Sequence, residues 1–304
     1  MRIGIVGIGG VGGYIGAKFC SLVGQEPQKY DLTFIARGRH AEAVAEHGIT
    51  VVEDETSYRA RPSRVCSAET VEGVFDLLLV CVKSYDIPSA ITALRKNIRP
   101  DTVIIPFANG VNNAEIIDAM VDAKVLNGCV YILSHIESPG VIRKAGSVFA
   151  ARFGHPDYFG ESLHVGYLFQ DAGLRAKASE DIEVDVWKKY LFISAFATLT
   201  SYYDMSIKRV HDEHFATAQA LLEEIVAVAS AKGINLAEEA SKALQTAATL
   251  PDEASTSMHL DFQQHRQTEL ENLTGYVVGE AARLGVDAPN MRRMYETLKE
   301  NPYG

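Results

Sequence analysis

Two neighbouring lysines, Lys188 and Lys189, begin the segment VWKKYLFISAFATLTSYY, which is otherwise almost wholly apolar. Burying an ammonium group is costly unless another group compensates its charge. A buried lysine can also act as a proton donor near neutral pH, because burial weakens its hold on the proton. Helical spacing places Lys189 on one stripe with Ile193 and Ala197, and Lys188 on another. Spacing alone therefore favours two solvated lysines over one catalytic lysine.

A glycine-rich loop follows the first apolar run of the chain, in RIGIVGIGGVGGYIGAKF. Its glycines match the pattern GxGxxG, in which the first permits a tight turn, the second lets the backbone approach a pyrophosphate, and the third lets a helix pack on a strand. The N-terminus of the helix adds N–H groups and a positive dipole. We therefore predict a dinucleotide site formed by Gly7, Gly9, Gly10, Val11 and Gly12. The alternative is a glycine-rich turn made only for packing.

The second apolar run ends in FIARGRH, which places Arg37 just after the predicted strand. Sites that prefer NAD carry an acidic residue at this point, where it binds the 2′-hydroxyl of the ribose. A guanidinium group suits a 2′-phosphate instead, so the sequence predicts NADP as the cofactor and Arg37 as its phosphate ligand. The alternative is that Arg37 and Arg39 are a pair of surface arginines.

Polar residues also follow the next two apolar runs of the chain. Lys83 comes directly after FDLLLVCV, and Asn109 comes shortly after TVIIPF. In an open α/β sheet, ligands bind beyond the carboxyl ends of the strands, where Gly7 and Arg37 are also expected. We therefore predict that Lys83 and Asn109 belong to the same site. Taken singly, Lys83 could be a solvated loop lysine and Asn109 part of an ordinary turn.

The order of the apolar runs predicts two domains. Up to about residue 180, apolar runs of strand length alternate with helical stretches, as in a parallel sheet covered by helices. Residues 125–133, 140–146 and 147–154 are expected to end the sheet and form a hairpin. Later segments show helical periodicity closed by glycines. We predict an α/β protein with a Rossmann-type parallel sheet domain over residues 1–180 and an all-helical domain over residues 181–304.

A cluster of serine and threonine residues precedes another apolar-periodic run, in EASTSMHLDFQQHRQTELENLTGY. Ser257 is a candidate N-cap of this helix. Asp261, Arg266 and Glu269 are expected to follow on the same helix. Glu269 could be an exposed carboxylate or the partner of a buried lysine.

The composition restricts the partners of the chain. Its 304 residues carry a net charge of −10, which argues against nucleic acid as the main partner. The four cysteines are scattered without a CxxC pair, as expected of thiols in a reducing compartment. No run reaches the ~18–20 apolar residues of a membrane span. We therefore expect a cytoplasmic protein without a membrane partner. His211 and His214 lack a third ligand, so no metal site is predicted.

Taken in order, these motifs resemble those of the ketopantoate reductase (2-dehydropantoate 2-reductase) family. The stretches concerned are GIGGVG, ARGRHAEAVAEHGI, VKSYD, ANGVNN, SPGVIRKAG, WKK and STSMHLDFQQHRQTELENLTG, which span nearly the whole chain. The resemblance implies a Rossmann domain followed by a helical domain, with the active site in the cleft between them. It also implies reduction of a small 2-keto acid, ketopantoate, to pantoate with NADPH, a step towards pantothenate and coenzyme A. Whether the chain is a homodimer is left open.

The resemblance also implies roles for individual residues. Lys189 corresponds to the catalytic lysine, and Glu269 to the glutamate that partners the lysine and the substrate hydroxyl. Ser257 corresponds to a serine that helps to hold the substrate. Lys83 and Asn109 are expected beside the nicotinamide, with Asn109 also orienting the substrate.

Some residues depart from the family pattern. Ile193 and Ala197, one and two turns after Lys189, and Ala254, three residues before Ser257, stand where the family usually carries asparagine. A site built to hydrogen-bond a substrate rejects analogues that lack the matching groups. The departures therefore allow a reductase of the same fold that acts on a different 2-keto or 3-hydroxy acid. A further alternative is an NADPH-binding redox sensor without catalysis.

Overall fold

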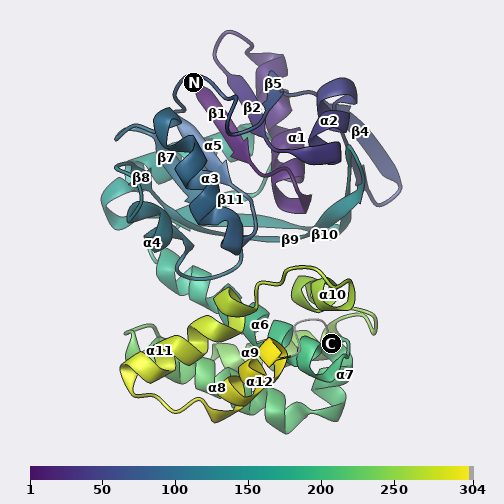
Figure 1. The fold of residues 1–304 in the computed structure, drawn as a ribbon, viewed down its shortest axis with the longest axis vertical. Helices are drawn as coiled ribbons and strands as arrows, with labels where there is room; N and C mark the ends of the chain where they lie inside the picture. Colours follow the sequence, from purple (N-terminus) through teal and green to yellow (C-terminus); the bar gives the residue numbers. More distant parts are fainter. Residues whose placement is uncertain (301–304) are drawn as a thin grey trace. The chain divides into compact units, whose positions relative to one another are not determined.

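The computed structural model describes residues 1–300, which form two compact units (Figure 1). Unit 1 comprises residues 1–108 and 112–182. Unit 2 comprises Asn109–Val111 together with the described residues from Glu183 onward. The short segment Asn109–Val111 thus follows a strand of unit 1 in the chain but makes its contacts in unit 2.

The first sheet of unit 1 is parallel, and its strands lie in the order β5-β2-β1-β6-β7-β8. The strands are β1 (Arg2–Val6), β2 (Asp31–Ile35), β5 (Arg64–Cys66), β6 (Leu77–Val80), β7 (Val103–Pro106) and β8 (Lys124–Val125). From β1 the chain adds β2 and β5 on one side, then returns to place β6 on the other side of β1. This reversal is the topological switch point of a Rossmann sheet, where such folds bind their ligands. The predicted Rossmann-type sheet is confirmed.

Both faces of this sheet are covered, which explains its continuous apolar runs. Successive side chains of β6 point to opposite faces: Leu77 and Leu79 join one core cluster, and Leu78 and Val80 join the other. The first cluster includes side chains of α1 (Gly10–Gln25), α2 (Gly38–His47) and α5 (Phe159–Asp171), and the second includes those of α3 (Ile87–Leu94) and α4 (Asn113–Asp118).

A second sheet completes unit 1. Its strands are β3 (Ile49–Glu53), β4 (Thr56–Ala60), β9 (Asn127–Ser138), β10 (Val141–Gly154) and β11 (Ala176–Ala178). The hairpin predicted near residues 125–154 is present as the antiparallel pair β9–β10. The division of its second half into two strands, 140–146 and 147–154, is wrong. Both segments belong to β10, whose register shifts between Ala145 and Phe149, so a bulge interrupts one strand instead of separating two.

Unit 2 is built around α6 (Ile182–Tyr203), most of whose side chains from Tyr190 onward are buried or half-buried. The other helices are α7 (Ile207–Glu213), α8 (Phe215–Ala231), α9 (Glu239–Thr249), α10 (Ser257–Gln263), the π-helix η4 (Glu271–Gly275), α11 (Tyr276–Leu284) and α12 (Pro289–Glu300). Between β11 and residue 300 the chain forms no strand, so the prediction of an all-helical second half is confirmed for the described residues. Within residues 1–300, no helix has the length and apolar character needed to cross a bilayer.

The segment predicted as one helix from Ser257 to Glu269 is interrupted. The chain turns at His265, which has a left-handed φ of 52°, and the N–H of Arg266 bonds back to the carbonyl of Asp261 at 2.9 Å. Helices commonly end with such a residue, but it is usually glycine. The histidine therefore gave no sign of a helix end in the sequence. Asp261 lies on α10, whereas Arg266 and Glu269 follow it.

A charged cluster joins α1 to the second sheet. Glu53 on β3 accepts hydrogen bonds from Lys18 Nζ and from the Tyr14 hydroxyl, each at 2.9 Å. The Nζ of Lys144, a side chain only 5% exposed, lies 3.5 Å from the same carboxylate. Burial opposes ionisation of Glu53, but these neighbours outweigh it and lower the pKa of the carboxyl group. One carboxylate thus compensates two lysines.

Glu53→Gln should lower the free energy of unfolding by on the order of 2 kcal/mol at neutral pH, because both lysines lose their counter-charge. The loss is smaller than for a fully buried pair, since the Glu53 side chain is 24% exposed. Because the folded-state pKa is lowered, this stabilisation is present above the ordinary pKa of 4.5 and disappears as the pH falls through the folded value.

Urea unfolding measures this difference. The control is Glu55→Gln, at an exposed position beyond β3, which should change stability by less than about 0.5 kcal/mol. Equal stability of the wild type and Glu53→Gln at neutral pH would contradict the argument.

Candidate active site

The glycine-rich loop has the close contacts that its glycines were predicted to permit. Gly7 has a φ of +84°, and a Cβ atom there would lie 2.7 Å from Val82 Cγ1. A Cβ on Gly12 would lie 2.0 Å from the carbonyl oxygen of Gly7, so the start of α1 can pack against β1 only without a side chain. A Cβ on Gly10 would lie 2.3 Å from the carbonyl oxygen of Ser134. Packing therefore accounts for these three glycines.

Gly9 has no such packing reason. It is the N-cap of α1, with extended backbone, and a Cβ atom there would meet nothing within 4 Å. Open space beside the first turn of a helix is what a pyrophosphate needs to approach the backbone N–H groups. The half-buried Val11 follows in the first turn. The loop therefore fits a dinucleotide phosphate group.

Arg37 and Lys83 lie beyond the carboxyl ends of β2 and β6, as the sequence predicted. Arg37 is exposed and occupies the N-cap position of α2 without using its side chain as a cap. Lys83 is half-buried and precedes a short 3₁₀ turn. Gly7 and Lys83 follow β1 and β6, the two strands at the switch point. This edge of the sheet is thus equipped with a phosphate loop and two cations.

The structure distinguishes the two lysines of α6. Lys188 has a side chain that is 40% exposed, and its Nζ lies 3.8 Å from Glu239. Lys189 is half-buried, and its Nζ donates a hydrogen bond to Oδ1 of Asn109 at 2.8 Å. Two of the predicted site residues, 80 positions apart in the chain, are therefore in direct contact.

Hydroxyl groups inside α6 hold the segment that follows Glu269. The hydroxyls of Tyr190 and Ser194 both donate to the carbonyl oxygen of Leu273, at 2.6 and 2.9 Å. Leu273 belongs to the π-helix η4, an arrangement often found near functional sites. This role of the two hydroxyls was not predicted from the sequence. The sequence does contain a pattern that could have indicated it, because hydroxyl side chains recur every four residues along an apolar helix, at Tyr190, Ser194 and Thr198.

Glu269 and Ser257 differ in their surroundings. Glu269 is 2% exposed, which excludes the alternative of an exposed carboxylate. Ser257 is exposed and is the first residue of α10. Its expected role as N-cap is wrong by one position, because the side chain of Thr256 accepts the hydrogen bond from the N–H of His259. Thr256 also bonds to Thr200 of α6 at 2.9 Å between their hydroxyl oxygens.

The positions that depart from the family pattern lie near these groups in the chain. Ile193 is half-buried and Ala197 is buried on α6, one and two turns after Lys189. Ala254 is half-buried, and its carbonyl accepts a hydrogen bond from the N–H of Ile207 at 2.8 Å. None of these side chains offers a polar group to a ligand.

His211 and His214, the pair considered as metal ligands, each contact a neighbouring side chain. His211 Nδ1 lies 2.8 Å from Asp212, and the ring of His214 stacks on Tyr203 with centroids 3.7 Å apart. Among residues 1–300, no group of three or more side chains with metal-binding atoms gathers in one place.

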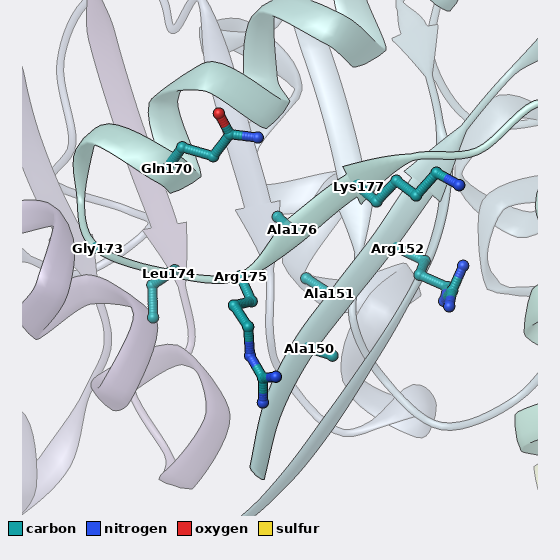
Figure 2. Close-up of a pocket in the computed structure, with 9 residues that line it drawn as sticks. All are labelled: Ala150, Ala151, Arg152, Gln170, Gly173, Leu174, Arg175, Ala176 and Lys177. Atoms are coloured by element: carbon teal, nitrogen blue, oxygen red, sulfur yellow. The ribbon is translucent and has the colours of Figure 1, made fainter. Parts of the chain in front are cut away.

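Unit 1 also has a cavity that none of the predicted site residues line. Figure 2 shows this cavity, of about 390 Å³, between the end of α5 and strands β10 and β11. Basic side chains line part of it, namely Arg152, Arg175 and Lys177. No site residue predicted from the sequence lies along it.

Comparison with known proteins identifies the family. The model of ketopantoate reductase PanE/ApbA matches residues 3–157, and the model of its C-terminal part matches residues 181–301. This chain belongs to the ketopantoate reductase family. It is therefore an NAD(P)-dependent oxidoreductase, and the predicted family and fold class are confirmed.

Individual ketopantoate reductase relatives match over nearly their whole length. The solved structure of 2-dehydropantoate 2-reductase from Porphyromonas gingivalis is 33% identical, with a TM-score of 0.86 over 98% of this chain and 99% of that one. The 2-dehydropantoate 2-reductase of Archaeoglobus fulgidus is 28% identical over 98% of this chain and 97% of its own. Bacillus subtilis YkpB, 29% identical over 98% of both chains, is named an uncharacterized oxidoreductase. Relatives of equal similarity thus include proteins with and without a named substrate.

Proposed function

We propose that this protein reduces ketopantoate to pantoate with NADPH, and that Lys189 is the proton donor. The hydrogen bond of 2.8 Å between Lys189 Nζ and Asn109 Oδ1 carries the proposal, together with membership of the family. It fixes the position of one ammonium group at a half-buried point of α6, while the neighbouring Lys188 is turned towards Glu239.

The residues of unit 1 are proposed to hold the cofactor. The N–H groups at the start of α1 would bind the pyrophosphate beside Gly9. Arg37, whose position lacks the acidic residue of an NAD site, would bind the 2′-phosphate. Lys83 would lie on the nicotinamide side. When bound, NADPH supplies the hydride that goes to the carbonyl carbon of the keto acid.

The residues of unit 2 are proposed to handle the proton. As the carbonyl oxygen gains negative charge, Lys189 Nζ donates a proton to it, a general-acid role worth about 10²–10⁴-fold in rate. Asn109 holds the lysine in place and orients the substrate. The buried Glu269 partners the lysine and the new hydroxyl group, and Ser257 at the start of α10 binds the substrate. We also propose that this chain forms a homodimer, since the Staphylococcus aureus ketopantoate reductase of the same fold is described as dimeric.

A second candidate substrate is a less polar 2-keto acid. Its motivation is the apolar stripe of α6 beyond Lys189, where Ile193 and Ala197 offer no hydrogen bond. A pocket with apolar contacts in place of amides would bind an alkyl or aromatic keto acid better than the hydroxyl-bearing ketopantoate.

A substrate panel separates these candidates. We expect the purified enzyme to oxidise NADPH, measured by the loss of nicotinamide absorbance, with a higher kcat/KM for ketopantoate than for its analogues with an alkyl or aromatic group. A higher kcat/KM for an apolar analogue would favour the second candidate. Binding of NADPH without turnover on any 2-keto acid would contradict both and favour a sensor.

A further inference from the structure

His40 lies at the meeting point of three segments of unit 1. It belongs to the first turn of α2, three residues after Arg37. Its Nδ1 accepts a hydrogen bond of 3.0 Å from the N–H of Gly140, in the turn between β9 and β10. An acceptor at Nδ1 means that the ring is neutral and carries its proton on Nε2. The ring thus ties the start of α2 to the β9–β10 turn.

The same hairpin is packed against the glycine-rich loop and its helix. A Cβ on Gly10 would lie 2.3 Å from the carbonyl oxygen of Ser134 on β9, and one on Gly13 would lie 2.8 Å from the Ile142 side chain on β10. Figure 1 shows β9 and β10 running across unit 1 beside α1. The hairpin therefore supports the helix start that is proposed to bind the pyrophosphate.

The turn also contacts α2 directly. A Cβ on Gly140 would come within 3.3 Å of the Ala43 Cβ, and the carbonyl of Gly140 accepts a hydrogen bond from the N–H of Thr50 on β3 at 2.8 Å. The turn is thus held from two sides, by β3 and by His40. The β9–β10 hairpin therefore contacts both helix starts that the proposed NADPH site uses.

We propose that His40 is a positioning residue for the cofactor: through the β9–β10 turn, its neutral ring fixes the start of α2, which carries Arg37, relative to the glycine-rich loop. The proposal rests on the NADPH site described under the proposed function. His40 itself need not touch the cofactor. Its Nε2 is enclosed by protein and makes no hydrogen bond of standard geometry within the described residues.

Protonation would break this arrangement. A proton on Nδ1 would face the N–H of Gly140, so two donors would oppose each other. Burial lowers the pKa of His40 below its ordinary 6.5, and the carbonyl groups of Ile8 in the glycine-rich loop and Ser138 in the turn act in the opposite direction. The ring is therefore neutral at neutral pH, and it becomes charged only at a lower pH than an ordinary histidine does.

Other titratable groups on the packed elements are mostly exposed to solvent. On α2 they are Arg37, Arg39, Glu42, Glu46 and His47, and on the hairpin they are Tyr131, His135, Glu137, Arg143 and Arg152 together with the buried Cys129 and Lys144. Glu137 accepts a hydrogen bond from Arg143 at 2.7 Å, so these two charges compensate each other. Exposed charges are screened by water and salt, so they affect the ring less than the direct bond to Gly140 does.

The test compares NADPH dissociation constants, measured by nicotinamide fluorescence at about pH 7.5, for the wild type and three variants. His40→Ala should bind NADPH about tenfold more weakly, because the Gly140 N–H loses its acceptor. His40→Asn, whose amide oxygen can replace Nδ1, should bind within about threefold of the wild type. The control His47→Asn, at an exposed position on the same helix, should match the wild type.

A pH series supplies a second readout that does not depend on the alanine variant being folded. As the pH is lowered from about 7.5, the 2′-phosphate also titrates, but equally for every variant. The wild type should lose more affinity than His40→Asn on acidification, because only the wild type can lose the acceptor at Nδ1.

The outcomes separate this inference from the proposed function. Failure of the wild type to bind NADPH would overturn both. Binding by the wild type, with an unchanged dissociation constant for His40→Ala or the same pH dependence in His40→Asn, would overturn the inference alone. A lower melting temperature of His40→Ala with unchanged NADPH affinity would assign the residue to stability only, which also overturns it.

Discussion

Lys189→Ala should reduce kcat for keto-acid reduction by about 10²–10⁴-fold, while NADPH affinity stays close to that of the wild type. The reason is that Lys189 is proposed to act only on the oxygen that gains charge in the transition state. Its Nζ is held by Asn109 at 2.8 Å in unit 2, whereas the groups proposed for the cofactor phosphates belong to unit 1. Steady-state kinetics and a separate NADPH titration measure the two effects.

The neighbouring lysine supplies the matched control. Lys188→Ala removes the same charge one residue earlier, from a side chain that is 40% exposed and only loosely paired with Glu239. A pairing of this kind contributes at most about 1 kcal/mol to stability. We expect kcat within about threefold of the wild type. Equal and small effects of the two substitutions would refute the role of Lys189.

Arg37→Ala should weaken NADPH binding by about 10–100-fold and change NADH binding by less than about threefold. The first value corresponds to the loss of charged hydrogen bonds to a phosphate, about 1.5–3 kcal/mol. NADH lacks that phosphate and so has no contact to lose. The Arg37 side chain caps no N–H group of α2, so its removal should leave the helix intact.

Arg39→Ala serves as the control for Arg37→Ala. Arg39 is also exposed and lies on the first turn of α2, but it is not the residue directly after β2. Its removal should alter the ratio of NADPH to NADH affinity much less. An unchanged ratio in Arg37→Ala would contradict the proposed 2′-phosphate contact and favour the surface-arginine alternative.

The strands of the parallel sheet could be predicted because each one leaves a signal in its own short stretch of sequence. Strands buried on both faces need continuous apolar runs, and β1, β2, β6 and β7 have them. Glycines with a steric reason also stand out, as Gly7 and Gly12 do. The β3–β4 hairpin could not be predicted in the same way, because β4 is half-exposed and polar and gives no such run.

The choice between Lys188 and Lys189 could not be made from spacing. It depends on Asn109, a residue 80 positions away that the fold places against α6. Helical periodicity likewise gave no warning of the break at His265, because the left-handed residue is not a glycine. The buried hydroxyls of Tyr190 and Ser194 acquire their purpose only when the carbonyl of Leu273 is brought to them. Long-range contacts of this kind leave little trace in the local sequence.

The most direct test of the central claim is isotope transfer from the cofactor to the keto acid. The enzyme is incubated with ketopantoate and NADPH that carries deuterium at the transferred position of nicotinamide C4, and the product is analysed by mass spectrometry and NMR. We predict pantoate with one deuterium atom, bound to C2, formed in equal amount to the NADP produced. Oxidation of NADPH without deuterium at C2 of a hydroxy acid, or no product from any 2-keto acid, would contradict the account.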